Sequence, residues 1–213
     1  MTNARKQVFH RGIAAPLLQP NIDTDAIIPS REIRRVSKEG LGDALFSGWR
    51  YRSAESREPE PGFILNQARY REASILLAGD NFGCGSSREH AVWALKDFGV
   101  KVILAPSFGG IFFNNCALNG ILAIELEEDA IARLARWVQA DPGGNRLEID
   151  LAAQRIRWRE GKEMRFDIEP ARRSLLLEGL DSIAATLRQE SAIRAFEEQD
   201  RQSRPWVYEF PDR

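Results

Sequence analysis

The chain has 213 residues, of which 43% are hydrophobic and 29% charged, with 30 basic and 31 acidic side chains. This composition is typical of a folded globular protein and excludes the disordered and collagen-like classes. The net charge of −1 provides no field to attract nucleic acid or anionic lipid, and no apolar stretch approaches the roughly 20 residues that span a bilayer, so we expect a cytoplasmic protein without nucleic-acid or membrane partners.

The first part of the chain is expected to form one strand followed by irregular structure. Residues 7–18 are mostly apolar and β-compatible, and they end at the turn-rich stretch 19–25. Residues 31–61 mix charged residues with Gly, Ser, Trp and Pro and show only weak periodicity. A long irregular segment inside a compact domain is usually functional or mobile, so we expect a mobile substrate loop at about 30–61.

The middle of the chain alternates apolar runs that suit buried strands with segments of helical periodicity. This order is typical of an α/β fold with neighbouring parallel strands. The expected strands are 74–79, 100–105 and 121–126, and the expected helices are 88–98, 107–119 and 128–139.

After Pro142 the pattern changes to short strands and then to helices. No linker is long enough to require a second domain, so we expect a single domain over 1–213 with a charged helical C-terminal extension at about 180–213. The expected strands are 147–151, 155–158 and 165–168, joined by turns at 153–154 and 160–162, and the expected helices are 170–178 and 180–198.

The residues that usually bind metals are scarce in this chain. It has two cysteines, Cys84 and Cys116, and two histidines, His10 and His90. These are too few for a disulfide framework and too few for a self-contained iron–sulfur cluster. We therefore expect no metal site built from this chain alone.

The sharpest local signal is Gly83-Cys-Gly-Ser-Ser-Arg-Glu-His90, which lies between an expected strand and an expected helix. Backbone N–H groups at a helix start, two hydroxyls and a guanidinium can converge there on an anionic ligand. Gly83 and Gly85 can adopt positive φ and allow the backbone to approach such a ligand closely. The segment therefore suits an anion-binding turn at the carboxyl end of a strand.

The same residues also allow a structural interpretation. Ser86 and Glu89 have the spacing of a capping box, which would only close the start of the helix. Cys84 suits a small buried residue better than a reactive thiol, and His90 suits a helix-face residue better than a base. Spacing alone leaves the capping and the anion-binding interpretations open.

A second signal is Asn21-Ile-Asp-Thr-Asp-Ala-Ile-Ile-Pro29, which places polar side chains just before an apolar triplet. Turn and capping chemistry explains this segment equally well. Taken together, the two segments resemble the small subunit of bacterial 3-isopropylmalate dehydratase and, more distantly, the swivelling C-terminal domain of aconitase. The resemblance covers nearly the whole chain, Phe82–His90 is its most specific part, and further matching stretches are 40–50, 73–78, 105–112 and 179–183.

This resemblance implies an α/β fold of the swivelling β/β/α type. It also implies a hydro-lyase subunit that interconverts 2- and 3-isopropylmalate through an alkene in leucine biosynthesis. In that family a large subunit holds a [4Fe–4S] cluster on three cysteines and leaves one iron open as a Lewis acid. The cysteine count agrees with such a division, in which this chain would be active only with its partner.

By the same resemblance, Ser86 would be the base that removes the proton next to a carboxylate. A free serine is a very poor base, so its alkoxide would need stabilisation from a helix start and a nearby cation. Ser87 and Arg88 would bind a substrate carboxylate, Arg88 by a two-pronged contact. The remaining residues that the resemblance assigns are Asp25, Gly83 and Gly85 as supporting residues, and Arg31 and Ile33 as substrate-binding residues.

One departure from the family concerns the expected substrate loop. The family usually has an aromatic residue at the position of Glu32, and the loop Arg31–Val36 lies over the variable part of the substrate. A related 2-hydroxy diacid of the citramalate or dimethylmalate type is therefore an alternative substrate. An alternative from another class is a non-catalytic anion-binding module in which Ser86 and Ser87 are plain caps.

Overall fold

The computed structural model describes residues 9–33, 39–53, 55–179 and 186–208. The chain divides into two compact units, Met1–Gly179 and Leu180–Arg213, and the second covers the residues of the expected helical extension. In the described residues, no helix has the length and apolar character needed to cross a membrane.

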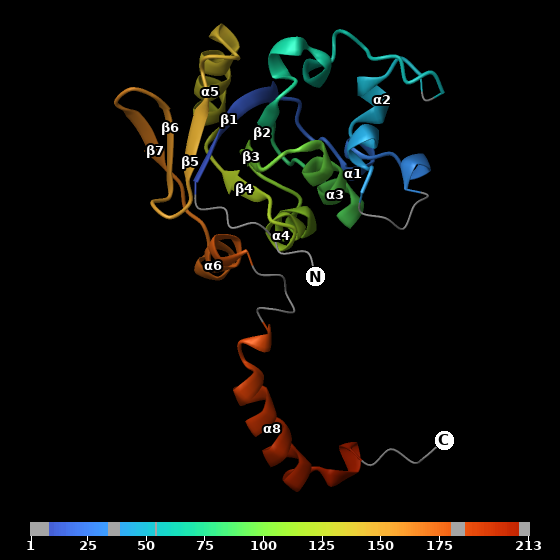
Figure 1. Ribbon diagram of the computed structural model, residues 1–213, viewed down its shortest axis with the longest axis vertical. Coiled ribbons are helices and arrows are strands. Elements are labelled where there is room, and N and C mark those ends of the chain that lie inside the picture. Colours follow the sequence, from blue (N-terminus) through green and yellow to red (C-terminus); the bar gives the residue numbers. More distant parts are fainter. Residues whose placement is uncertain (1–8, 34–38, 54, 180–185, 209–213) are drawn as a thin grey trace. The chain divides into compact units, whose positions relative to one another are not determined.

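The first unit is built on a seven-stranded sheet with the order β4-β3-β2-β1-β5-β6-β7 (Figure 1). The strand β1 joins a parallel half to an antiparallel half, because its C-terminal part pairs with β2 and its N-terminal part pairs with β5. The strands are β1 Phe9–Leu17, β2 Ala73–Ala78, β3 Val102–Ala105, β4 Leu122–Glu125, β5 Leu147–Asp150, β6 Arg155–Arg159 and β7 Lys162–Arg165.

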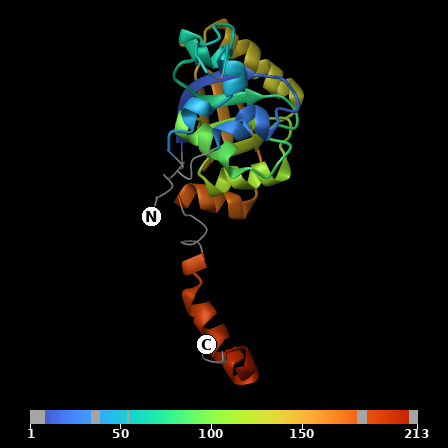
Figure 2. The same ribbon diagram turned by 90° about the vertical axis from the view of Figure 1, so that its right-hand side faces the viewer.

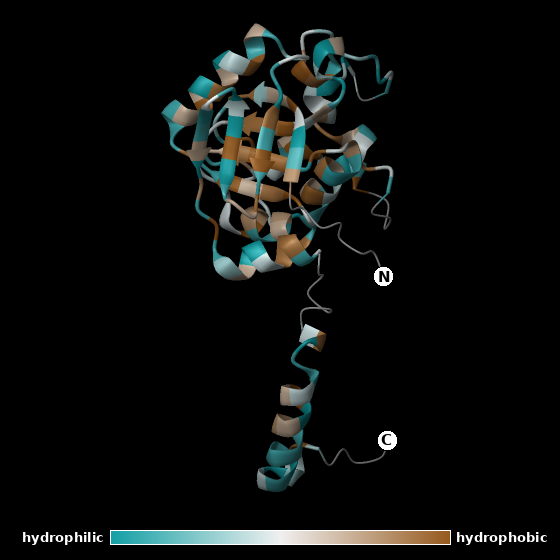
Figure 3. Ribbon diagram, turned by 60° about the vertical axis from the view of Figure 1, so that its left-hand side comes forward, coloured by the Kyte–Doolittle hydropathy of each residue, from teal (hydrophilic) through white to brown (hydrophobic). Residues whose placement is uncertain are grey.

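Helices cover both faces of the parallel half, as the alternation of strand residues requires. On one face, α3 (Glu89–Phe98) and α4 (Gly110–Leu118) pack against residues such as Leu76 and Ile103. On the other face, α5 (Glu128–Ala140) packs against residues such as Ile75 and Val102. Figures 1 and 2 show the helices on either side of the sheet, and Figure 3 shows how hydrophobic residues gather on its central strands.

The expected α/β order is therefore confirmed, with the β2–α3–β3–α4–β4–α5 series close to the predicted bounds. The bounds of the last expected strand were wrong. The last strand of the sheet is β7 at Lys162–Arg165 rather than 165–168, because a tight turn at Gly161, with φ of 67°, lets Lys162 pair at once with Arg159. α6 (Pro170–Glu178) follows with the expected bounds, and Gly179 is its C-cap.

The described part of residues 30–70 contains only short helical turns, yet it contributes to the core. Leu45 and Phe46 are fully buried, and Phe46 stacks on Trp49 with 5.8 Å between the ring centroids. The weak periodicity of these residues gave no sign of this burial, because each short element buries at most two residues. The short elements between β1 and β2 are α1 Thr24–Ile27, η1 Ser30–Glu32, η2 Gly42–Ala44, α2 Ser47–Arg50, η3 Ile64–Asn66 and η4 Ala68–Tyr70.

The described residues of the second unit include α8 (Glu190–Ser203) and the short turn η5 (Pro205–Val207). The expected helix 180–198 was wrong in its bounds, and its first residues, 180–185, lie outside the described part of the chain. The helix runs on to Ser203, where Pro205 prevents its continuation. Asp200 ties this end together, since it accepts hydrogen bonds from Arg204 Nε at 2.6 Å and from the Tyr208 hydroxyl at 2.9 Å.

Candidate functional site

The site is formed where the loops after β1 and β2 pair with each other. These strands are parallel, so their carboxyl ends meet at one edge of the sheet, where ligands of open α/β sheets bind. The pairing continues past the strands as an isolated parallel bridge between Asp23 and Cys84. The backbone bonds that join the two loops run from Asn21 N to Asp80 O (2.8 Å), from Gly83 N to Ile22 O (2.7 Å) and from Thr24 N to Cys84 O (2.9 Å).

Two glycines make this close pairing feasible. Gly83 and Gly85 have φ values of 73° and 87°, so the expected positive φ is confirmed at both. A Cβ atom on Gly83 would lie 2.2 Å from the ring of Phe112, and one on Gly85 would lie 3.3 Å from Cβ of Asp23. The glycines thus permit close approach of the chain's own side chains.

Ser86 and Ser87 are exposed at this edge, and among the described residues neither hydroxyl has a hydrogen-bond partner. The backbone of Ser86 is held firmly by contrast. Its carbonyl oxygen accepts hydrogen bonds from Thr24 Oγ1 at 2.9 Å and from Arg88 N at 2.7 Å. The two hydroxyls are therefore available to a ligand while the chain that carries Ser86 is fixed.

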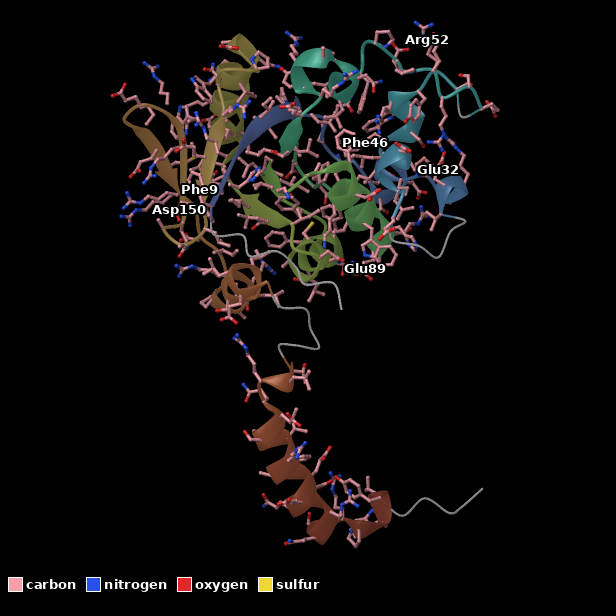
Figure 4. The ribbon with its side chains drawn as sticks, viewed as in Figure 1. Phe9, Glu32, Phe46, Arg52, Glu89 and Asp150 are labelled. Atoms are coloured by element: carbon pink, nitrogen blue, oxygen red, sulfur yellow. The ribbon has the colours of Figure 1, made fainter. Side chains whose placement is uncertain are left out.

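The capping-box interpretation of Ser86 and Glu89 was wrong. The helix α3 begins at Glu89, its N-cap is Arg88, and no side chain caps it. Instead, Oε1 of Glu89 accepts a hydrogen bond from Asn119 Nδ2 at 2.9 Å and one from Trp93 Nε1 at 3.2 Å. Glu89, labelled in Figure 4, thus ties the start of α3 to the end of α4.

Arg88 lies beside Asp25, and the two side chains form an ion pair across the paired loops. The same Oδ1 atom of Asp25 accepts a hydrogen bond from the Ser30 hydroxyl at 3.0 Å. The hydrogen bond from Arg88 is the main reason why the pKa of Asp25 is lowered, and the bond from Ser30 adds to it. Asp25 therefore stays ionised and holds the Arg88 guanidinium at the exposed edge.

The remaining two predicted residues lie on the turn that follows Ser30. Ile33 packs against the core cluster around α3, and Arg31 contacts Glu32 at 3.8 Å. Among the described residues, no hydrogen bond or ion pair joins either of them to Ser86. Arg31 and Glu32 line a cavity of about 550 Å³ together with Gly40, Leu41, Asp43, Ala44, Tyr51 and Arg57. Residues 34–38 of the expected substrate loop lie outside the described residues.

Glu32, labelled in Figure 4, is one of the residues that line this cavity. Its carboxylate forms an ion pair with Arg57 at 2.6 Å, and only 13% of its side chain is exposed. Arg57 in turn donates a hydrogen bond to the Asp43 carbonyl at 3.0 Å. A charged network therefore occupies the position where the resemblance implies an aromatic side chain.

The described residues do not suit an iron–sulfur cluster. No group of three or more His, Cys, Asp or Glu side chains among them is placed to hold a metal ion. Cys116 is fully buried, and this burial raises the pKa of its thiol far above the usual range, which disfavours the thiolate that a metal needs. Cys84 is half-buried, and its carbonyl rather than its thiol contributes to the loop pairing.

Sequence reasoning missed two contributors to the site. Thr24, in the middle of the Asp-Thr-Asp signal, holds the Ser86 carbonyl, and Asn119 holds Glu89. The Thr24 signal was present in the sequence, but its partner lies 62 residues away and depends on the strand pairing.

As a whole, two free hydroxyls beside an oriented guanidinium can bind a carboxylate by charge-assisted hydrogen bonds.

Comparison with known proteins gives consistent matches along the chain. Residues 5–129 match the model of the aconitase C-terminal domain, residues 132–170 match the LeuD_N model, and residues 182–209 match the C-terminal domain of 3-isopropylmalate dehydratase small subunits. The first of these matches confirms the expected fold class. A dehydratase related to aconitase implies an iron–sulfur cluster in the assembled enzyme, and the small subunit of a two-subunit enzyme implies a large-subunit partner.

The relatives agree with these models. The 3-isopropylmalate dehydratase small subunit of Cupriavidus necator is 53% identical over 94% of this chain and 96% of the relative. The small subunit of Methylibium petroleiphilum is 49% identical over 93% of this chain and 95% of its own length. The solved 3-isopropylmalate dehydratase (leuD) of Methanocaldococcus jannaschii is 26% identical with a TM-score of 0.62, over 89% of this chain and 99% of that one. The chain therefore belongs to the family of 3-isopropylmalate dehydratase small subunits.

Proposed function

We propose that this chain supplies the base and the carboxylate-binding groups of a cytoplasmic hydro-lyase that interconverts 2- and 3-isopropylmalate with a large subunit. The observation that carries the proposal is the exposed Ser86 hydroxyl, unpaired among the described residues, beside Arg88 at the carboxyl edge of the parallel strands. An exposed, incomplete site of this kind needs a second surface to exclude water.

In this proposal, Ser86 Oγ takes the proton from the carbon next to a substrate carboxylate. Loss of that proton and of the neighbouring hydroxyl gives the alkene and water, and addition of water in the other orientation gives the isomer. Ser87 donates a hydrogen bond to a substrate carboxylate, and Arg88 binds it through its guanidinium. Asp25 forms an ion pair with Arg88 and so holds the Arg88 guanidinium in its orientation until the substrate binds.

The iron–sulfur cluster is inferred to belong to the large subunit. Two observations support this inference. Among the described residues, no three His, Cys, Asp or Glu side chains lie close enough together to hold a metal ion, and the Cys116 thiol is buried. The described residues therefore do not fit the cluster, and the roles proposed for them are confined to the substrate.

The decisive experiment compares Ser86→Ala with Ser87→Ala in the complex with the large subunit. Ser86→Ala should lower kcat by about 10²–10⁴-fold, as loss of a general base does, with KM nearly unchanged. Ser87→Ala, which removes an equally exposed hydroxyl, should mainly raise KM. Both melting temperatures should stay close to that of the parent, because neither hydroxyl has a partner among the described residues.

The alkene is followed by its ultraviolet absorbance, and kcat, KM and melting temperature are measured on the same preparations. If Ser86→Ala loses activity only in step with thermal stability, Ser86 is a structural residue and the proposed role is withdrawn. Arg88→Lys extends the test, because an ammonium keeps the charge but not the forked geometry, so KM should rise.

A related 2-hydroxy diacid is the second candidate substrate, and one observation favours it. The cavity that Arg31, Glu32 and Arg57 help to line contains a charged network. An isopropyl group would gain little binding free energy in this cavity, because burying apolar surface against charged groups contributes less than burying it against apolar groups.

A further inference from the structure

Thr24 is one of the few polar residues that are buried in this protein, with 1% of its surface exposed. Every polar group of this residue has a partner. Its backbone N–H donates to the Cys84 carbonyl at 2.9 Å, and its own carbonyl accepts from Ile28 N at 3.0 Å. Its hydroxyl donates to the Ser86 carbonyl at 2.9 Å. Two of these three bonds reach across to the loop that carries Ser86.

The preceding residue fixes Thr24 from its own side. Asp23 is the N-cap of α1, and its Oδ1 atom accepts a hydrogen bond from Ala26 N at 2.7 Å. Thr24 is the first residue of that helix, so its backbone conformation is set by the cap. A Cβ atom on Gly85 would lie 3.6 Å from Thr24 Oγ1, which shows how closely the loop passes over the hydroxyl.

The hydrogen bond from Thr24 helps to fix the backbone position of Ser86, from which its side chain extends. The Ser86 carbonyl is held from two sides, by the Thr24 hydroxyl and by Arg88 N, and this fixes the peptide unit that follows its Cα atom. The Ser86 hydroxyl has no partner of its own among the described residues. When a side chain has no hydrogen-bond partner, the position of its reacting oxygen depends on the position of the backbone to which it is attached.

We infer that Thr24 is a positioning residue, which aims the Ser86 oxygen at the substrate by holding the Ser86 carbonyl. This inference rests on the proposed role of Ser86 as the base. Thr24 itself touches neither substrate nor reacting atoms, because it is buried beneath the loop. Loss of its hydroxyl should therefore lower kcat and leave the carboxylate-binding contacts of Arg88, and with them KM, nearly unchanged.

The experiment uses the assembled complex with four substitutions. Thr24→Val replaces the hydroxyl by a methyl group of similar size and should lower kcat by about 10–100-fold, the range that a misplacement of about 1 Å causes. Thr24→Ser keeps the donor and should stay close to the parent. Ser74→Ala is the matched control, because it removes a hydroxyl that bonds His10 at 2.9 Å at the opposite end of β2. Ser86→Ala tests the base itself.

The outcomes separate the two claims. If Ser86→Ala is inactive and Thr24→Val retains the parent kcat, the positioning role is wrong and the base is upheld. If Ser86→Ala stays active, the base assignment is wrong and Thr24 loses its role with it. The inference is also overturned if Thr24→Val and Thr24→Ser both lose kcat in proportion to their loss of melting temperature. If Thr24→Val does not assemble, Thr24→Ser and Thr24→Ala, which differ by one hydroxyl, give the same comparison.

Discussion

Two ionisable side chains at opposite edges of the sheet respond differently to acid. Asp25, at the carboxyl edge, has a lowered pKa, mainly because Arg88 donates a hydrogen bond to it. A carboxyl group of this kind contributes stability above its unfolded pKa of about 3.9 and loses it only as the pH falls through the lower folded value. The Asp25–Arg88 pair is therefore intact throughout the neutral and mildly acidic range.

His10, at the other edge, changes its contribution in a milder range. Burial is the main cause of its lowered pKa, and the charge of Lys101 adds to it. The unfolded chain then binds a proton from about pH 6.5 downward, before the folded chain does, so the free energy of unfolding falls as the pH falls from 6.5 through the folded pKa.

We expect His10→Gln to reduce this loss, because an amide can still bond Ser74 but does not titrate. Urea unfolding at several values between pH 8 and pH 5 measures the effect for the parent and the variant. Parallel decreases of the two unfolding free energies would show that another group causes the pH dependence.

At the scale of elements, α3 connects the site to the middle of the expected substrate loop. Its first residue, Glu89, bonds Asn119, as described above. Near its end, Asp97 accepts a hydrogen bond from Gly42 N at 2.7 Å, and Arg50 lies over the ring of Phe98 at 4.8 Å from the centroid. Residues 39–51 are thus attached to the helix that begins directly after Arg88, while the mobility of the loop at 30–61 stays a prediction.

The loop prediction can be tested at Glu32. Glu32→Phe restores an aromatic side chain and removes the ion pair with Arg57, so the kcat/KM ratio between isopropylmalate and smaller malates should change by roughly 10-fold or more. Glu32→Gln is the control, because it removes the charge without adding apolar surface. Substrate competition assays measure the ratio, and an unchanged ratio in Glu32→Phe would exclude this turn from substrate selection.

The sequence predicted the elements better than it predicted the contacts between them. The buried strands and the amphipathic helices of the α/β part have strong periodicity, and their order alone indicates a parallel sheet. The bond from Thr24 to Ser86 depends on the register of β1 with β2, which no local pattern specifies. The capping-box error has the same origin, because Glu89 finds its partner Asn119 on another helix.

At the scale of the whole molecule, the residues of the two core clusters belong to the first unit. Among the described residues, the last one that packs against either core cluster is Leu177. We therefore expect a chain that ends at Gly179 to keep its melting temperature within about 2–4 °C of the full chain, a shift that corresponds to about 1 kcal/mol in a domain of this size. Thermal unfolding followed by circular dichroism provides the test, and a large decrease would reveal contacts that the core clusters do not include.

The proposed location of the iron–sulfur cluster on the large subunit gives a prediction for the isolated chain. It should be colourless and inactive, because it has two cysteines, of which one is deeply buried. Iron and sulfide analysis after purification without a partner measures this directly. Stoichiometric iron and sulfide in the isolated chain would contradict the inferred location of the cluster.

The position of β1 has a consequence for the synthesis of the chain. Its C-terminal part can pair with β2 soon after β2 is made, which also joins the two loops of the site. Its N-terminal part, Phe9–Gly12, must wait for β5 at Leu147–Asp150, and at about 5–20 residues per second this takes on the order of 10 s on the ribosome. During that interval its unpaired N–H and C=O groups form an open strand edge that other nascent chains can join. The strand that organises the site thus keeps one edge open until β5 has been made.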